Sequence, residues 1–272
     1  MSTPIALTIA GSDPSGGAGI QADLKTFTVL GVYGTAVITA LTAQSTQGVT
    51  GILPVAPSFV SRQITTLVED VRPTATKTGM LNDRATVLAV AAEVQCCDLH
   101  PLVVDPVMVA TSGDSLIEDA AIAAVRSELL PLADLITPNL DEAARLLGVS
   151  QAASEEEMVA QTKALLALGC KAVVLKGGHA IGAEAVDILM ARGGEILRLA
   201  LPRIATPHTH GTGCTFSAAV TAHLAQGQSL SVAVAAAKRF VHAALQGGQS
   251  LRIGQGSGPI DHLYAVRPHT IH

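Results

Sequence analysis

Short apolar runs of strand length alternate with stretches of helical periodicity along almost the whole chain. Six of these runs are expected to be buried strands: Ile5–Ala10, Thr35–Leu41, Thr74–Gly79, Leu102–Asp105, Leu135–Thr137 and Ala172–Lys176. Strands that alternate with helices pair in parallel through crossover connections, which place helices on both faces of the sheet. The alternation therefore predicts an α/β fold with three layers, α/β/α, around a mostly parallel central sheet.

The expected helices carry signals of their own. From about residue 58, one apolar stripe recurs at helical spacing, formed by Val60, Ile64, Leu67, Val68 and Val71. Ser154 and Glu157 have the spacing of a capping box. The 272 residues contain no internal repeat, low-complexity tract or Pro/Gly linker. Residues 1–272 are therefore interpreted as a single domain, with a short C-terminal tail from about residue 266.

The composition excludes several classes of protein. Apolar residues make up 49% of the chain and charged residues only 14%, so the chain can bury a large core and is not disordered. Because aromatic residues are only 2%, that core must consist mainly of Ala, Val, Leu and Ile. The 17 Lys and Arg against 22 Asp and Glu give a net charge of −5 without a basic cluster, which argues against a nucleic-acid partner.

Neither a membrane span nor an export signal is expected. The uncharged stretches Thr26–Ser61 and Ile204–Ala237 are interrupted by Gly, Ser, Thr and His, so neither supplies about 20 consecutive apolar residues. No positive charge precedes the first apolar run, which is too short for a signal peptide. The cysteines show neither a disulfide framework nor zinc spacing, which favours reduced thiols and a cytoplasmic location.

Ligands of parallel sheets bind beyond the carboxyl ends of the strands, so the residues after each apolar run form the candidate site. The first such segment, Gly11–Gly19, is rich in glycine and joins a strand to a helix. It fits neither the GxxxxGK[ST] loop nor the GxGxxG spacing of known phosphate-binding motifs. By itself it is as compatible with a structural turn as with a binding loop.

The segment His210-Gly211-Thr212-Gly213-Cys214-Thr215 is more informative, because it precedes a long, uncharged, Ala-rich helix. Its glycines free the first-turn N–H groups to bind an anion, and the helix dipole adds to that attraction. A thiol at such a helix start is expected to have a lowered pKa, so Cys214 can take a proton from a substrate hydroxyl. The alternative, equally open from these residues alone, is that Cys214 is a small core residue beneath a glycine turn.

Polar residues also follow three other expected strands. Asn139 and Glu142 share a helix face and can hold a hydrated Mg²⁺ near nucleotide phosphates, although the residues alone favour a helix cap. Asp105, before Pro106, either binds a metal or closes a turn. For Lys176, a solvated side chain is the default interpretation.

Together these segments resemble one family. The resemblance runs from Ala6 to about His262 and rests on eight motifs in order: Ala10-Gly-Ser-Asp-Pro-Ser-Gly-Gly-Ala-Gly-Ile-Gln-Ala-Asp-Leu-Lys25, Ala40-Leu-Thr-Ala-Gln44, Lys77-Thr-Gly-Met80, Asp105-Pro-Val-Met108, Thr137-Pro-Asn-Leu-Asp-Glu142, Lys176-Gly-Gly-His179, His210-Gly-Thr-Gly-Cys-Thr215 and Gly256-Ser-Gly-Pro259. On these residues the chain resembles the hydroxymethylpyrimidine/phosphomethylpyrimidine kinases of thiamine biosynthesis, which belong to the ribokinase-like superfamily.

The resemblance implies a ribokinase-like fold and a kinase that acts twice with ATP and Mg²⁺. ATP would phosphorylate the hydroxymethyl group of 4-amino-5-hydroxymethyl-2-methylpyrimidine, and then that phosphate, to give a diphosphate. The implied residues are Gly11, Asp23, Gln44, Met80 and Val107 around the pyrimidine; Gly211, Thr212, Gly213 and Cys214 as the anion hole; Asn139 and Lys176 by the nucleotide; and Asp105 and Glu142 by the metal. By analogy with the family, a homodimer is expected.

Gln44 makes physical sense as the specificity residue. Its carboxamide offers an acceptor and a pair of donors, which can meet the amine and the adjacent ring nitrogen of an aminopyrimidine together. Without the resemblance, a loop amide bonded to the backbone would be favoured. Ser45 and Thr78 depart from the family pattern, which has Asn and Ile there, and both neighbour pocket residues. The alternatives are a pyridoxal kinase of the same superfamily and a non-catalytic pyrimidine-binding module.

Overall fold

One nine-stranded sheet organises the residues described by the computed structural model, which are 3–109, 116–178 and 182–267. Its strand order is β3-β2-β1-β4-β5-β6-β7-β8-β9. The bounds are β1 (Ile5–Ser12), β2 (Tyr33–Ser45), β3 (Gly48–Pro54), β4 (Ala75–Thr78), β5 (Leu102–Val104), β6 (Leu135–Ile136), β7 (Ala172–Lys176), β8 (Glu184–Ala191) and β9 (Ile196–Pro202).

The centre of the sheet is parallel and its edges are antiparallel. Strands β2, β1, β4, β5, β6 and β7 pair in parallel, whereas β3 pairs with β2, and β8 and β9 follow β7, in antiparallel register. Each of the six parallel strands corresponds to one of the predicted apolar runs. The prediction of a mostly parallel central sheet is therefore confirmed.

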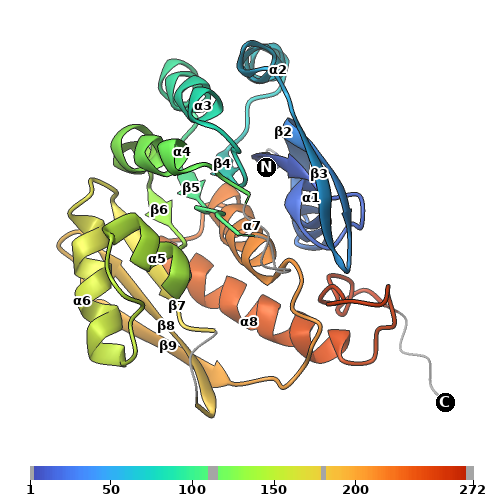
Figure 1. Cartoon of the computed structure of the whole chain (residues 1–272), viewed down its shortest axis with the longest axis vertical. Helices are drawn as coiled ribbons and strands as arrows, with labels where there is room; N and C mark the ends of the chain where they lie inside the picture. Colours follow the sequence, from blue (N-terminus) through green and yellow to red (C-terminus); the bar gives the residue numbers. More distant parts are fainter. Residues whose placement is uncertain (1–2, 110–115, 179–181, 268–272) are drawn as a thin grey trace.

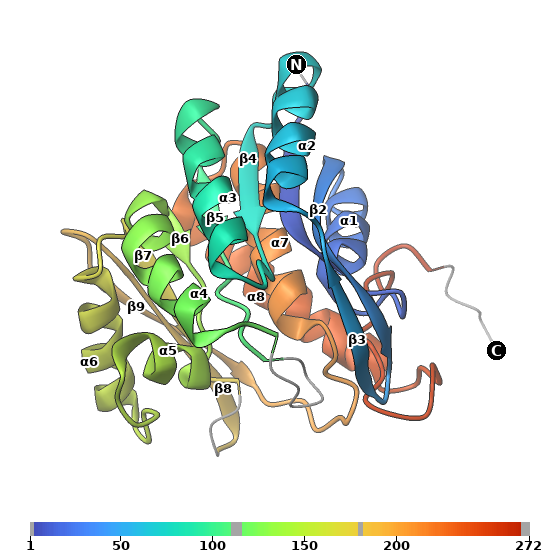
Figure 2. The same ribbon diagram turned by 45° about the horizontal axis from the view of Figure 1, so that its top comes forward.

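Helices cover both faces of the sheet (Figures 1 and 2). One face packs against α1 (Gly19–Val29), α7 (Thr212–Ala225) and α8 (Leu230–Gly248). The other packs against α2 (Pro57–Asp70), α3 (Arg84–Cys96), α4 (Asp119–Ala124), α5 (Leu140–Leu147) and α6 (Glu155–Leu166). Short π and 3₁₀ turns, Val125–Leu129 and Leu130–Leu132, continue α4. The three predicted layers are present.

Small side chains bring α7 and α8 close to the sheet. Fully buried alanines line both helices where they pack, at Ala218, Ala219, Ala222, Ala233 and Ala237. Because alanine adds little bulk, the axis of α7 approaches β1, β4 and β5, and its N-terminus lies beyond the carboxyl ends of these strands. A core built mainly from small aliphatic residues, with few aromatic ones, thus allows these two helices to lie close to the sheet.

The antiparallel edge strands β3, β8 and β9 were not among the predicted strands. Their apolar residues are interrupted by Gly, Asp, Glu and Arg, so they lack the continuous apolar run of a strand buried on both faces. The partner β3 also lengthens β2: the predicted strand ends at Leu41, but pairing with β3 extends it to Ser45. A register shift between Ala43 and Gln44 marks this extension.

A capping box has two reciprocal hydrogen bonds, and the box predicted between Ser154 and Glu157 at the start of α6 is confirmed for one of them. The Ser154 hydroxyl accepts a hydrogen bond from the Glu157 N–H at 3.2 Å, as expected. The Glu157 carboxylate, however, accepts from the Ala153 N–H at 2.7 Å rather than from Ser154. The helix start is closed one residue earlier than in a standard capping box.

The described part of the expected tail is held to the body. Tyr264 packs on Phe240 with ring centroids 5.4 Å apart, and Arg267 contacts Asp261 at 3.1 Å. The single-domain interpretation of residues 1–272 stays a prediction. Within residues 3–109, 116–178 and 182–267, none of the helices combines the length and the apolar character that a membrane span requires.

Candidate active site

A cavity of about 530 Å³ opens at the carboxyl ends of the parallel strands, between the loop after β1, the extension of β2 and the N-terminus of α7. This is the edge of the sheet at which the sequence predicts ligand binding. Most of the predicted site residues line this cavity: Gly11, Gln44, Met80, Asp105, Val107, Asn139, Glu142, Lys176, Gly211, Thr212, Gly213 and Cys214.

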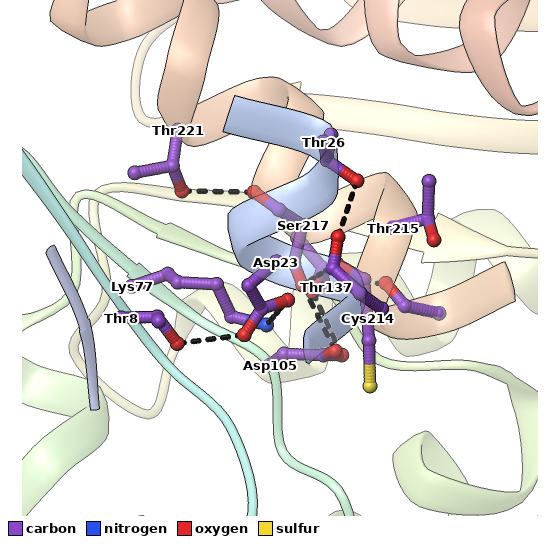
Figure 3. A network of polar contacts seen from close by, with 12 residues as sticks. Thr8, Asp23, Thr26, Lys77, Asp105, Thr137, Cys214, Thr215, Ser217 and Thr221 are labelled. Atoms are coloured by element: carbon purple, nitrogen blue, oxygen red, sulfur yellow. Dashed lines mark hydrogen bonds and ion pairs between the residues drawn. The ribbon is translucent and has the colours of Figure 1, made fainter. Parts of the chain in front are cut away.

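Asp23 is the exception, because it does not reach the cavity. It lies fully buried on α1, where one carboxylate oxygen accepts from Lys77 Nζ at 2.8 Å and the other from Thr8 Oγ1 at 2.6 Å (Figure 3). Both oxygens therefore face protein donors. The structure places Asp23 behind Lys77, rather than in the direct contact with a pyrimidine that the resemblance implies.

Lys77 is a candidate site residue to which the sequence reasoning gave no role, although it belongs to the motif Lys77-Thr-Gly-Met80. It lies on β4, fully buried, yet it lines the cavity. Burial alone would lower the pKa of Lys77, but the charges of Asp23, Cys214 and Asp105 outweigh it and raise this pKa. The ammonium group is therefore charged beside the N-terminus of α7. A lysine in the middle of the apolar run Thr74–Gly79 was the available signal, since lysine is almost never fully buried without a partner.

The N-terminus of α7 depends on a close contact between two loops. Gly211 caps the helix with φ +81°, in the left-handed region, and a side chain there would overlap the carbonyl group of Gly17. Only glycine fits this position. Of the N–H groups that follow, that of Thr212 donates to the Thr209 carbonyl at 3.2 Å and that of Thr215 to the Gly211 carbonyl at 2.9 Å. The N–H groups of Gly213 and Cys214 have no acceptor within the helix, and both residues line the cavity. A Cβ atom on Gly213 would lie 3.4 Å from Lys176 Nζ, so the lysine and the helix start converge.

Asp13 and His210 hold the same two loops together. Asp13 Oδ2 lies 2.8 Å from His210 Nε2 and also accepts from the Ala18 N–H at 2.8 Å. Burial opposes the charge of Asp13, but the hydrogen bonds from His210, Ser15 and Ala18 prevail and lower the pKa of Asp13 to about 2. The loop after β1, which the sequence left open between turn and binding loop, thus supports the anion-binding segment.

Asp105 and Lys176 meet at the centre of the cavity floor. Lys176 Nζ lies 3.3 Å from Asp105 Oδ1. The hydroxyl groups of Thr137 and Ser217 lie 3.1 and 3.0 Å from the same carboxylate (Figure 3). Burial opposes ionisation, but Lys176, Lys77 and the two hydroxyls prevail and lower the pKa of Asp105. The solvated side chain expected by default for Lys176 is wrong, because the side chain is only 13% exposed and paired.

Asn139 and Glu142 form the helix cap that the residues favoured, and they also line the cavity. Asn139 Oδ1 accepts from the Glu142 N–H, and Glu142 Oε2 accepts from the Asn139 N–H, so the capping box of α5 is complete. Burial raises the pKa of Glu142 to about 7, with Lys176 opposing and Asp105 adding to the shift. Glu142 can therefore cap α5 and also face a ligand in the cavity, because the cap occupies only one of its two carboxylate oxygens.

The carboxylates fit a metal that is shared with a bound phosphate. Asp105 and Glu142 supply the oxygen ligands that Mg²⁺ prefers. Within the part of the chain that the structure describes, no group of three or more His, Cys, Asp or Glu side chains could hold a metal ion. Mg²⁺ in nucleotide sites commonly takes one or two carboxylates, water and substrate phosphates, so two protein carboxylates suffice.

The expected low pKa of Cys214 is wrong for this structure. The residue is only partly exposed to the cavity, and burial raises the pKa of its thiol to about 12, although Lys77 lowers it. The helix start alone therefore does not make a thiolate, because desolvation of the charged form is the larger effect. Cys214 is nevertheless on the cavity wall, and not in the core beneath the glycine turn.

Gln44 lies on the extension of β2, facing the cavity across from the N-terminus of α7. Met80 and Val107 supply apolar surface beside it, and a side chain on Gly11 would lie 3.0 Å from the Met80 sulfur. The cavity thus combines a carboxamide and apolar side chains with the N-terminus of a helix. Ser45 and Thr78, the two residues that depart from the family pattern, do not line the cavity. The motif residue His179 lies outside the described residues.

Comparison with known proteins gives a consistent result. A sequence model described as phosphomethylpyrimidine kinase matches residues 13–261. The chain is 51% identical over 262 residues to a hydroxymethylpyrimidine/phosphomethylpyrimidine kinase of Rhizobium meliloti, covering 96% of this chain and 98% of that protein.

Solved structures show the same fold. A pyridoxal kinase of Staphylococcus aureus, in complex with AMP-PCP and pyridoxal, superposes with a TM-score of 0.90 at 33% identity, over 98% of this chain and 96% of that chain. A phosphomethylpyrimidine kinase of Clostridium difficile superposes with a TM-score of 0.78 at 39% identity, over 89% and 99% of the two chains.

The raised pKa of Cys214 predicts slow alkylation. With a pKa of about 12, only about one thiol in ten thousand is ionised at pH 8, and the thiolate is the reactive form. We expect iodoacetamide to label the exposed Cys96 at least roughly a hundredfold faster than Cys214. Peptide mapping by mass spectrometry between pH 7 and 10 measures both rates in one sample. Labelling of Cys214 before Cys96 would contradict the pKa shift.

Proposed function

The chain belongs to the phosphomethylpyrimidine kinase family, and we propose that the cavity described above carries out both of the phosphoryl transfers this membership implies. The protein is a phosphotransferase of thiamine biosynthesis that uses ATP. It phosphorylates the hydroxymethyl group of 4-amino-5-hydroxymethyl-2-methylpyrimidine and then the resulting phosphate. The observation that carries the assignment of the cavity is that Gln44 and the N-terminus of α7 face one shared space.

In this proposal Gln44 orients the pyrimidine. Its carboxamide pairs with the 4-amino group and the adjacent ring nitrogen, while Met80 and Val107 contact the faces of the ring. The 5-hydroxymethyl group then points toward Cys214 and the start of α7. A substrate that lacks the amine leaves the buried polar atoms of Gln44 unpaired, which lowers its affinity.

The terminal phosphate of ATP is bound by the N–H groups at the start of α7 and by Lys176. The helix dipole and the ammonium group both favour negative charge at the place where it develops during transfer. Asn139, which also lines the cavity, is proposed to contact the nucleotide. Phosphoryl transfer requires mainly such positioning and neutralisation, and little covalent chemistry from the protein.

Asp105 and Glu142 are the residues proposed to hold Mg²⁺. The metal, when bound with ATP, neutralises phosphate charge during the transfer. Lys176 lies 3.3 Å from Asp105, so it keeps this carboxylate ionised and ready to act as a ligand. The second Glu142 oxygen, which the helix cap leaves open, completes the donor pair.

Cys214 is proposed as the base of the first step. The pKa of about 12 means that the free protein holds a neutral thiol. A neutral thiol cannot accept a proton, so in this proposal Cys214 first loses its own proton to solvent, and the charge of Lys77, which lowers this pKa, favours that loss. The thiolate then takes the proton of the substrate hydroxyl as its oxygen attacks phosphorus, which returns Cys214 to the neutral thiol. In the second step the nucleophile is a phosphate oxygen, which is already anionic and needs no base.

The fold alone does not separate this activity from pyridoxal phosphorylation. The high TM-score to a pyridoxal kinase supports pyridoxal as the second candidate substrate. A pyridine without the amine makes only part of the contacts that Gln44 offers. A non-catalytic pyrimidine-binding module is disfavoured, because Gly211, Lys176 and Cys214 converge as a phosphoryl-transfer site requires.

The homodimer and the cytoplasmic location remain proposals. The antiparallel edge of the sheet supports self-association, because Leu41 and Leu53 face each other across β2 and β3 and are 46% and 66% exposed. Sedimentation equilibrium and cell fractionation are the measurements that decide these two points.

ADP release tests the proposed function directly. We expect the purified protein to release ADP with the aminopyrimidine and again with its monophosphate, each in the presence of Mg²⁺. Pyridoxal is expected to compete poorly, with kcat/KM lower by about a hundredfold or more, because the carboxamide contacts are incomplete. Absence of ADP release with both pyrimidines would refute the assignment, and a preference for pyridoxal would establish the second candidate.

The base role of Cys214 predicts that its loss affects the two steps unequally. Cys214→Ala is expected to slow the first phosphorylation by about a hundredfold or more and the second by less than about tenfold. Rapid-quench measurements with each substrate separate the steps. Cys96→Ala, an exposed cysteine, is the matched control and should change neither rate. An equal loss in both steps would remove Cys214 from the base role.

Gly211 and Gly227 allow the loop contact to be tested against backbone strain alone. Both have φ near +80°, but a Cβ atom meets the Gly17 carbonyl only at Gly211, and meets nothing within 4 Å at Gly227. Gly227→Ala is expected to lower the free energy of unfolding by about 1–2 kcal/mol with kcat preserved.

Gly211→Ala should cost more stability and lower kcat by about a hundredfold, because the anion-binding N–H groups move. Urea unfolding and steady-state kinetics on both variants give the comparison. If Gly211→Ala retains the kcat of Gly227→Ala, the start of α7 does not bind the transferred phosphate.

A further inference from the structure

The hydroxyl group of Thr42 lies between two oxygens that cannot both be satisfied. Thr42 Oγ1 is 2.8 Å from the carbonyl oxygen of Ser12 and 3.1 Å from Oε1 of Gln44. A hydroxyl carries a single hydrogen, and both neighbours in this arrangement accept hydrogen bonds but cannot donate. One of the two contacts would therefore bring lone pairs together without a hydrogen between them.

Of the two oxygens, the Ser12 carbonyl is the preferred acceptor of the Thr42 hydroxyl hydrogen. Its contact is the shorter one, and a backbone carbonyl cannot exchange its oxygen for a donor. Ser12 is also held in place, since Gln21 Nε2 donates to the Ser12 hydroxyl at 2.8 Å. The Gln21 carboxamide is itself fixed by the Asp13 N–H, which donates to Gln21 Oε1 at 2.8 Å. The loop after β1 thus presents a fixed acceptor to Thr42.

Gln44 can resolve the conflict because its carboxamide has a donor end. A half-turn about its last side-chain bond exchanges Oε1 and Nε2 with little change in shape. Nε2 then donates to the free lone pair of Thr42 Oγ1, and every group in the chain Ser12, Thr42 and Gln44 has a correct partner. Among the described residues, Thr42 is the only one that forms a hydrogen bond with the Gln44 side chain.

We infer that Thr42 sets the orientation of the Gln44 carboxamide and thereby selects 4-aminopyrimidines over 4-oxopyrimidines. In the orientation that Thr42 imposes, Oε1 and the second Nε2 hydrogen face the cavity as an acceptor beside a donor. A 4-aminopyrimidine presents the complement, a donor amine beside the acceptor N3. A 4-oxopyrimidine presents an acceptor oxygen beside an N3–H donor, so both contacts would be repulsive. Thr42 is a positioning residue in this scheme, which rests on the proposed role of Gln44.

A purely structural role of Thr42 and a positioning role predict different substrate preferences. If Thr42 only supported β2, its loss would weaken both pyrimidines alike. If it fixes the carboxamide, its loss allows Gln44 to turn and to accept either pattern. The ratio of the two kcat/KM values, and not their absolute size, therefore reports on Thr42.

The test compares Thr42→Val, which is isosteric but lacks the hydroxyl, with Thr42→Ser, which keeps it. The two substrates are the natural aminopyrimidine and 5-hydroxymethyl-2-methylpyrimidin-4-one. For Thr42→Val we expect kcat/KM to fall by about tenfold with the amino substrate and to stay level or rise with the oxo compound. The preference for the amino substrate should therefore shrink by at least about tenfold. For Thr42→Ser we expect the wild-type preference to be retained.

The outcomes separate this inference from the function on which it rests. If wild-type protein does not phosphorylate the aminopyrimidine, the proposed function fails. If wild type is active and Thr42→Val keeps the same amino-to-oxo ratio, the inference on Thr42 is wrong. The inference is equally wrong if Thr42→Ser loses the preference as completely as Thr42→Val. Thermal unfolding establishes that each variant is folded, and Thr42→Ala replaces Thr42→Val if the latter is not.

Discussion

The close contact between the Gly17 carbonyl and Gly211 is the constraint on which the candidate site depends. It joins the loop after β1 to the start of α7, and the bond from His210 to Asp13 spans 197 residues of sequence to hold it. Because a side chain at Gly211 has no space, the two loops meet backbone to backbone. This contact places the helix N-terminus beside the carboxyl ends of β1, β4 and β5, where Asp105 and Lys77 also lie. The start of α7 and Gln44, the two proposed binding ends, therefore line one cavity.

Burial is the largest single effect on the pKa values of Asp13, Asp105, Glu142 and Cys214, and the hydrogen bonds and charges around each group decide whether that effect is overcome. Asp13 and Asp105 each receive several hydrogen bonds or ion pairs, so their pKa values fall despite burial. Glu142 receives one backbone hydrogen bond beside the charge of Asp105, so its pKa rises to about 7. Cys214 has Lys77 as its main support, and its pKa rises to about 12. A helix dipole acts through partial charges, which do not offset desolvation of a thiolate here.

The sequence determined the parallel centre of the fold well, because six strands buried on both faces have continuous apolar runs. It also brought the motif residues to one edge of the sheet, since carboxyl ends of parallel strands share that edge. It failed where a contact joins residues remote in sequence. Asp23 carries no local sign that Lys77, 54 residues away, takes its carboxylate. Lys176 likewise gives no sign that Asp105 removes it from solvent, and the thiol of Cys214 gives none of its burial. Pairing of this kind is a property of tertiary packing, and spacing along the chain does not encode it in a simple form.

The part of the cavity that is proposed to distinguish substrates lies outside the parallel centre of the sheet that the sequence predicted. Gln44 and Thr42 stand on the extension of β2, which exists because β3 pairs with it in antiparallel register and shifts at Ala43. In the proposed function, the parallel strands and the start of α7 bind the transferred phosphate, a task that does not depend on the heterocycle. A superposition is dominated by those shared strands and helices, and so it matches a pyridoxal kinase as readily as a pyrimidine kinase. Recognition of the ring is instead proposed to rest on the orientation of the Gln44 carboxamide. That choice involves hydrogen bonds each worth about 1 kcal/mol, which move no backbone atom. On this proposal, substrate preference is set by hydrogen-bond polarity at the sheet edge, which a superposition of backbones does not measure.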